Sequence, residues 1–217
     1  MCSRQPWAHG ACDSIDRMLW PLIYLPGERL SVAELSAARL DGDVVEIGEG
    51  YMPADAIEST ATRAASLRSI CGSRLVVGLW SAAWVYGALP DPPSRHSVMR
   101  GAAHRVGNLI DRRAIFHDVG VEEQDVADVE GVLVTSPLRT VIDVARRIRE
   151  PEHRERATSV VVALIEAGLV DPREAITRMD TVKRLPGSKH ARREIAAHLE
   201  GIRERAANLP RQPVVTR

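Results

Sequence analysis

The spacing of apolar residues changes along this chain of 217 residues, and the changes predict an alternation of helices and strands. Apolar residues at positions 44, 45 and 47 are followed by Gly48-Glu49-Gly50 and Tyr51-Met52, which is typical of a β-hairpin with a glycine-bearing turn. Further runs predict strands over 96–99, 114–117 and 126–135, the last interrupted at Gly131, and residues 74–78 form a short apolar segment.

Helices are predicted where apolar residues recur every three or four positions and where capping residues precede them. Ser31 and Glu34 form a capping box, in which a hydroxyl and a carboxylate satisfy free backbone amides, so a helix is expected from there to about Arg39. Other helices are expected after Asp13, where the helix is short, and over 58–71, 79–87, 152–169, 171–180 and 188–209.

One more helix is predicted to begin at Ser136-Pro137, with Ser136 at the N-cap and Pro137 in the first turn. Arg139 and Asp143 lie four positions apart on this helix, a spacing that favours an ion pair. We interpret these side chains as pinning the helix, and a binding role for Arg139 is the alternative.

These elements indicate an α+β fold in two parts. Residues 1–56 are expected to form a small, degenerate winged-helix-like module, because their order is helix, turn, helix and hairpin, with 1–12 loose. Residues 57–210 are expected to form an α+β domain with a central strand-bearing part and a helical C-terminal third. A tail over 211–217 follows.

The charge is balanced, with 29 basic and 29 acidic residues, which argues against a uniformly basic nucleic-acid wrapper. It nevertheless alternates, from −5 over 1–56 to +5 over 57–117, −4 over 118–150 and +4 over 151–217. Such blocks either pair with one another across the folded surface or present basic faces to phosphate or to a partner. The candidate DNA- or partner-binding residues are Arg100, Arg105, Arg112 and Arg113 in the second block and Arg184, Lys189, Arg192 and Arg193 in the last.

No catalytic, cofactor-binding or metal-binding motif stands out in the sequence. Ser81 has no His–Asp signature nearby, and the histidines and cysteines lack the short spacings of a zinc site. Three cysteines without CxxC spacing suit a reducing cytoplasm. We therefore expect a cytoplasmic protein that is not an enzyme and has no cofactor, metal or membrane span. Trp80, Trp84 and Tyr86 are interpreted as core residues, with a ligand or partner platform as the alternative.

Four stretches, in this order, carry a family resemblance: LSVAELSAARL with the Gly-Tyr hairpin (30–52), LWSAAWVYGALP (79–90), VEGVLVTSPLRTVIDVAR (129–146) and LPGSKHARREIAAHL (185–199). The chain resembles the actinobacterial antitoxins of the AbiEi type, from the type IV toxin–antitoxin and abortive-infection group. The resemblance implies an N-terminal winged helix that binds the operon's own promoter DNA, a C-terminal domain with the antitoxin role, and a nucleotidyltransferase-like toxin as partner.

Two features depart from the family pattern. Only residues 37–43 separate the capping-box helix from the hairpin, which leaves no room for the arginine-rich recognition helix of the family. The module is also acidic, and acidic surfaces repel phosphate, so DNA binding through residues 1–56 is not expected. The nuclease-like C-terminal domain of some relatives is not expected either.

The resulting hypothesis is an antitoxin-like, non-enzymatic regulator of a toxin–antitoxin or phage-defence module, with autoregulation through DNA as a further role. Two alternatives stay open: a stand-alone DNA-binding transcriptional regulator, and a protein-interaction scaffold that binds no DNA. The patterns favour no particular oligomeric state.

Overall fold

The computed structural model describes residues 23–72, 75–101 and 112–181, together with 192–193, 195–197 and 200–201 near the C-terminus. The predictions made for residues 1–22, for Arg105, Arg184 and Lys189, and for the tail over 211–217 lie outside the described residues. Most of the predicted helix over 188–209 does so too.

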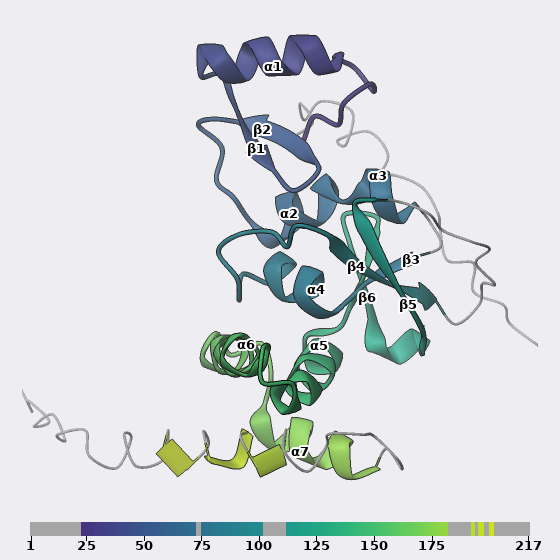
Figure 1. Ribbon diagram of the computed structural model, residues 1–217, viewed down its shortest axis with the longest axis vertical. Helices are drawn as coiled ribbons and strands as arrows, with labels where there is room; N and C mark the ends of the chain where they lie inside the picture. The colour runs from purple at the N-terminus through teal and green to yellow at the C-terminus, as the bar shows by residue number, and fades with distance from the viewer. Residues whose placement is uncertain are drawn as a thin grey trace, which may run out of the picture.

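From residue 23 onward, the described N-terminal part contains one helix and one hairpin, at the top of Figure 1. Helix α1 (Val32–Asp41) begins at the predicted capping box of Ser31 and Glu34 and ends at Gly42, whose φ of 84° is in the left-handed region. Strands β1 (Val44–Ile47) and β2 (Gly50–Pro53) pair antiparallel, as predicted.

The centre of the molecule is a mixed sheet of five strands in the order β5-β4-β3-β7-β6. The central strand β3 pairs antiparallel with β4 and parallel with β7, while β4 and β5 are parallel and β6 and β7 form a hairpin. The strands predicted over 96–99, 114–117 and 126–135 are confirmed as β4 (His96–Gly101), β5 (Ala114–Val121), β6 (Val126–Val129) and β7 (Val132–Thr135). The short apolar segment over 74–78 forms β3 (Leu75–Val77).

The single helix predicted over 58–71 is wrong, because the structure has two short helices there. Helix α2 (Thr60–Ser66) ends at Leu67, and α3 (Arg68–Cys71) follows. The backbone of Leu67 has a ψ of 0°, its N–H donates to the carbonyl of Ala64 three residues earlier, and its side chain is fully buried. A tight turn of this kind redirects the chain while its apolar residue stays in the core.

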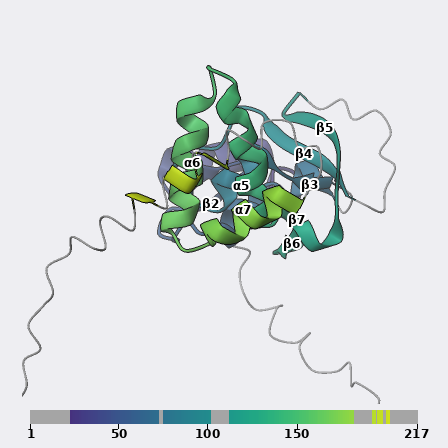
Figure 2. The same cartoon turned by 90° about the horizontal axis from the view of Figure 1, so that it is seen from below.

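The remaining helices are α4 (Leu79–Val85), α5 (Pro137–Ala145), α6 (Arg154–Glu166) and α7 (Pro172–Thr181), with 3-10 helices η1 (Glu123–Asp125) and η2 (Arg146–Arg149). Helix α6 is shorter than the predicted 152–169. Viewed from below, α5, α6 and α7 lie together in front, with strands β3, β4 and β5 to one side (Figure 2). The fold is therefore α+β with a helical C-terminal part, as predicted.

Among the described residues, a large apolar cluster from Ile23 to Ile195 joins the hairpin, the sheet and most of the helices, and Leu79, Met99 and Val121 form a second, small cluster. Ile195, which lies within the predicted helix over 188–209, is fully buried. The hairpin tip docks on this core: Gly48 has a φ of 52°, and a side chain there would collide with Ser66 and press on the Trp84 ring. The core thus crosses residue 56, the boundary that the sequence predicts between two units.

Candidate functional site

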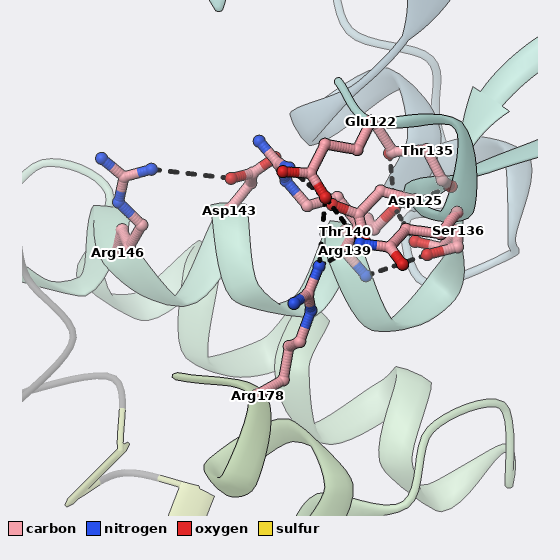
Figure 3. A network of polar contacts seen from close by, with 10 residues as sticks. Glu122, Asp125, Thr135, Ser136, Arg139, Thr140, Asp143, Arg146 and Arg178 are labelled. Atoms are coloured by element: carbon pink, nitrogen blue, oxygen red, sulfur yellow. Dashed lines mark hydrogen bonds and ion pairs between the residues drawn. The ribbon is translucent and has the colours of Figure 1, made fainter. Parts of the chain in front are cut away.

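A buried ion-pair network surrounds Arg139 on the first turn of α5 (Figure 3). The Arg139 Nε donates to Asp143 Oδ2 at 2.8 Å, and its Nη1 donates to Asp125 Oδ2 at 2.8 Å. Both acidic residues are buried, since Asp143 is only 5% exposed and Asp125 only 7% exposed. Arg178, from α7, contacts Asp125 at 3.4 Å and Glu122 at 3.8 Å. The predicted pair of Arg139 and Asp143 is confirmed, whereas the sequence analysis missed Asp125 and Arg178.

The corner between β7 and α5 holds this network in place. The Ser136 hydroxyl accepts the backbone N–H of Arg139 at 3.2 Å, and Pro137 occupies the first turn, as predicted. The Thr135 and Thr140 hydroxyls lie 2.7 Å apart, and the Ser136 N–H donates to the Asp125 carbonyl at 2.7 Å. Short local hydrogen bonds therefore fix the direction in which Arg139 leaves the helix.

The network keeps the Arg139 guanidinium charged. Burial acts to lower the pKa of Arg139, but the adjacent carboxylates of Asp143 and Asp125 outweigh it and raise the pKa. One planar cation thus bridges two buried anions, a geometry that suits arginine and not lysine.

An arginine-rich cavity begins on the other side of Asp143. The Asp143 Oδ1 lies 3.6 Å from Nη1 of Arg146, the first residue of η2. The cavity has a volume of about 420 Å³. Its lining residues are Leu79 at the start of α4, Met99 of β4, His117 and Val119 of β5, Asp143 of α5, Arg146, Arg147 and Arg149 of η2, and Glu150 directly after η2.

The wall of this cavity contains two unusual features. Leu79 has a φ of 50°, a left-handed conformation that is uncommon outside glycine. His117 is half-buried, and its Nε2 has no hydrogen-bond partner in the described part of the chain. Burial lowers the pKa of His117, Arg147 lowers it further, and Asp143 opposes both. This site was not predicted from the sequence, although three arginines within four positions, Arg146, Arg147 and Arg149, were an available signal.

Comparison with known families places the Arg139 network and the arginine-rich cavity in one domain. Residues 76–181 match the family described as the AbiEi antitoxin C-terminal domain. The chain carries an AbiEi-type antitoxin domain. It runs from β3 to α7 and contains the Arg139 network and the arginine-rich cavity. The family resemblance of the sequence is thus confirmed, and the domain has a regulatory role in toxin–antitoxin systems. No curated protein matches the chain.

Five of the candidate arginines lie among the described residues: Arg100, Arg112, Arg113, Arg192 and Arg193. His96 pairs with Ala114 and Arg100 with Gly120 along the parallel strands β4 and β5. Arg100 therefore lies at the opposite end of this pair from Arg113, which directly precedes β5. Arg100 contacts Asp118 at 3.8 Å and Arg113 contacts Glu49 at 3.1 Å. Arg112 is exposed just before β5, and the adjacent Arg192 and Arg193 are exposed near the C-terminus; none of these five arginines lines the cavity.

The aromatic residues of α4 face the interior to different degrees. Trp84 is 1% exposed and lies in the core. Trp80 and Tyr86 are partly buried and pack against the core cluster. The Tyr86 hydroxyl donates to the Thr135 carbonyl at 2.9 Å, which ties α4 to β7. The Trp80 ring lies 4.8 Å from the Arg156 guanidinium.

The structure brings a histidine and an acid to Ser81, which the sequence spacing could not show. Ser81 Oγ lies 3.3 Å from His96 Nδ1, and His96 Nε2 lies 3.5 Å from Glu49 Oε1. Ser81 is fully buried, and its hydroxyl accepts the Ser97 N–H at 2.8 Å. These contacts connect α4, β4 and the hairpin turn, and they leave no exposed nucleophile at Ser81.

Glu150, Glu152 and His153 place one ligand atom each within 4.8 Å of one another, but Glu150 is already engaged by Arg147 at 2.8 Å. This partly exposed group carries no metal assignment. In the described part of the chain, no helix combines the length and the apolar character needed to cross a membrane.

Proposed function

We propose that this protein is the antitoxin of a toxin–antitoxin or phage-defence module and acts in the cytoplasm by binding its toxin without catalysis. The observation that carries the proposal is the match of residues 76–181 to the AbiEi antitoxin C-terminal domain. The buried polar groups support a non-enzymatic role, because Asp125 and Asp143 are held by arginines and Ser81 is enclosed. The partner is a nucleotidyltransferase-like toxin, as the family resemblance implies.

Co-expression tests this function. The toxin encoded beside this gene should arrest growth alone, and the intact chain should restore growth and co-purify with the toxin. A chain with Arg173→Gln should restore growth as well as the intact chain does, because this exposed α7 residue lies outside the network and the cavity. Absence of rescue would contradict the antitoxin role, and rescue without a complex would contradict direct binding.

A second role, autoregulation through promoter DNA, is favoured by one observation. Arg112, Arg192 and Arg193 are exposed arginines in segments of net positive charge. We propose that such residues, rather than the acidic N-terminal module, contact phosphate. On the basis of the sequence alone, we include three further basic residues in this proposal: Arg105, Arg184 and Lys189.

Binding to a labelled promoter fragment should then weaken steeply with salt, with a log–log slope near −0.9 for each phosphate neutralised. The double variant R192E/R193E should weaken binding and flatten the slope, whereas Arg173→Glu, which reverses an exposed charge on α7, should change neither. A lack of any shift at low salt would contradict the DNA role and leave the toxin complex as the regulatory form.

A further inference from the structure

The arginine-rich cavity has an excess of positive charge. Arg146, Arg147 and Arg149 face two acidic residues, and both acids are already engaged, Asp143 by Arg139 and Arg146 and Glu150 by Arg147. Among the residues that the structure describes, Arg149 has no acidic partner, and its side chain is exposed at the cavity. Structural ion pairing therefore accounts for two of the arginines and not for the third.

The size and the remaining walls of the cavity fit a small molecule. A volume of about 420 Å³ lies within the range of roughly 300–1,000 Å³ that is common for ligand sites. Leu79, Met99 and Val119 also line the cavity, and Val119 is 42% exposed. A cavity lined by both apolar and cationic side chains suits an anion that carries an apolar part.

Phosphate is the anion that this arrangement matches best. Guanidinium groups present fixed pairs of donors to phosphate oxygens, and arginine is favoured wherever such paired recognition occurs. Arg147 and Arg149 flank the buried Ile148 in η2, so the short helix fixes their spacing. The half-buried position of Arg147 also keeps its charge from being fully screened by water.

We propose that the arginine-rich cavity, which is lined by residues of β4, β5 and η2, binds a small molecule that carries a phosphate group. Arg147 and Arg149 contact the phosphate, and Leu79, Met99 and Val119 contact the rest of the ligand. The site goes beyond the antitoxin role and does not rest on it, because ligand binding is measured on the isolated full-length chain without toxin or DNA.

Three probes separate the chemical sources: inorganic phosphate, AMP and adenosine. Calorimetry on the full-length chain should show binding of phosphate or AMP and no binding of adenosine. Tighter binding of AMP than of phosphate identifies a nucleotide-like ligand, whereas equal binding identifies free phosphate and overturns the contact of Leu79, Met99 and Val119 with the rest of a ligand. Binding of adenosine as tight as that of AMP, or no binding of either anion at millimolar concentration, would overturn the proposal.

Arg149→Gln is the decisive variant, because this exposed arginine supports no described ion pair and its loss should leave the fold intact. We expect it to weaken binding of the anion about tenfold or more, the size of one lost charge-assisted hydrogen bond. Arg173→Gln removes the same charge outside the cavity and should leave binding unchanged. Equal weakening by both variants would mean attraction by net charge only and would overturn the site.

His117 provides a second readout in the same site. Its pKa is lowered by burial and by Arg147, while Asp143 acts in the opposite direction. The other charged groups of the cavity wall are Arg146, Arg149 and Glu150. A phosphate on Arg147 offsets that cation, so the pKa of His117 in an NMR titration should rise when the probe is bound. An unchanged His117 pKa at saturating probe would place the anion elsewhere.

Discussion

Replacing Arg139 by alanine should lower the free energy of unfolding by about 3–5 kcal/mol, the usual cost of removing one partner from a buried ion pair. The loss arises because Asp143 and Asp125, both nearly fully buried, each give up a 2.8 Å bond to this guanidinium. Arg146 and Arg178 remain, but at 3.6 Å and 3.4 Å they are weaker partners. Urea unfolding at pH 7 measures the change.

The chain offers a matched control for this prediction. Arg39 and Glu46 form an ion pair of similar length, 3.0 Å, but their side chains are 47% and 59% exposed. Arg39→Ala should therefore change the free energy of unfolding by no more than about 1 kcal/mol. Arg139→Lys keeps the charge but not the two-armed geometry, and it should fall between wild type and Arg139→Ala. Equal costs for Arg39→Ala and Arg139→Ala would show that burial does not strengthen the network.

Acid should destabilise the fold through His96. Burial, and then the nearby Arg113, lower the pKa of His96 to about 4. In the unfolded chain the pKa of histidine is about 6.5, so between these values the unfolded state binds a proton that the folded state does not. Stability is therefore retained above pH 6.5 and falls as the pH drops toward 4. The difference of about 2.5 pKa units corresponds to about 3 kcal/mol.

Unfolding in urea at a series of pH values between 7 and 4 tests this sign. Carboxylates also lose their charge toward the lower end, so the variant His96→Gln, whose amide does not titrate, serves as the reference. The wild-type curve should fall more steeply than the variant curve between pH 6.5 and 4.5. Parallel curves would mean that His96 is protonated as readily in the folded state as in the unfolded one.

Short-range signals in the sequence were sufficient for much of the fold. The caps at Ser31 and Ser136, the glycine-bearing hairpin turn and the pair of Arg139 and Asp143 all depend on residues within about five positions of one another. Their geometry follows from local backbone and side-chain chemistry. The break at Leu67 was not predicted, because it depends on the burial of Leu67 in the tertiary core and not on local helix propensity.

The candidate site could not be predicted from the sequence, because its residues are far apart in the chain. Arg178 reaches Asp125 across 53 positions, and the cavity combines residues of β4, β5, the start of α4 and η2. No periodicity connects such segments, since only the strand order of the sheet brings them together. The family resemblance identified the domain, but its motifs are structural and did not mark Arg149 or His117.

The position of β3 in the sheet has a consequence for the timing of synthesis. Val77 of β3 pairs with Val134 of β7, which follows 57 positions later in the chain. At translation rates of about 5–20 residues per second, roughly 3 to 11 s pass between the two. During that interval one edge of β3 stays uncovered, and the antitoxin domain cannot complete its sheet. A nascent chain stalled before β7 would therefore present an open strand edge, the kind of surface that promotes aggregation.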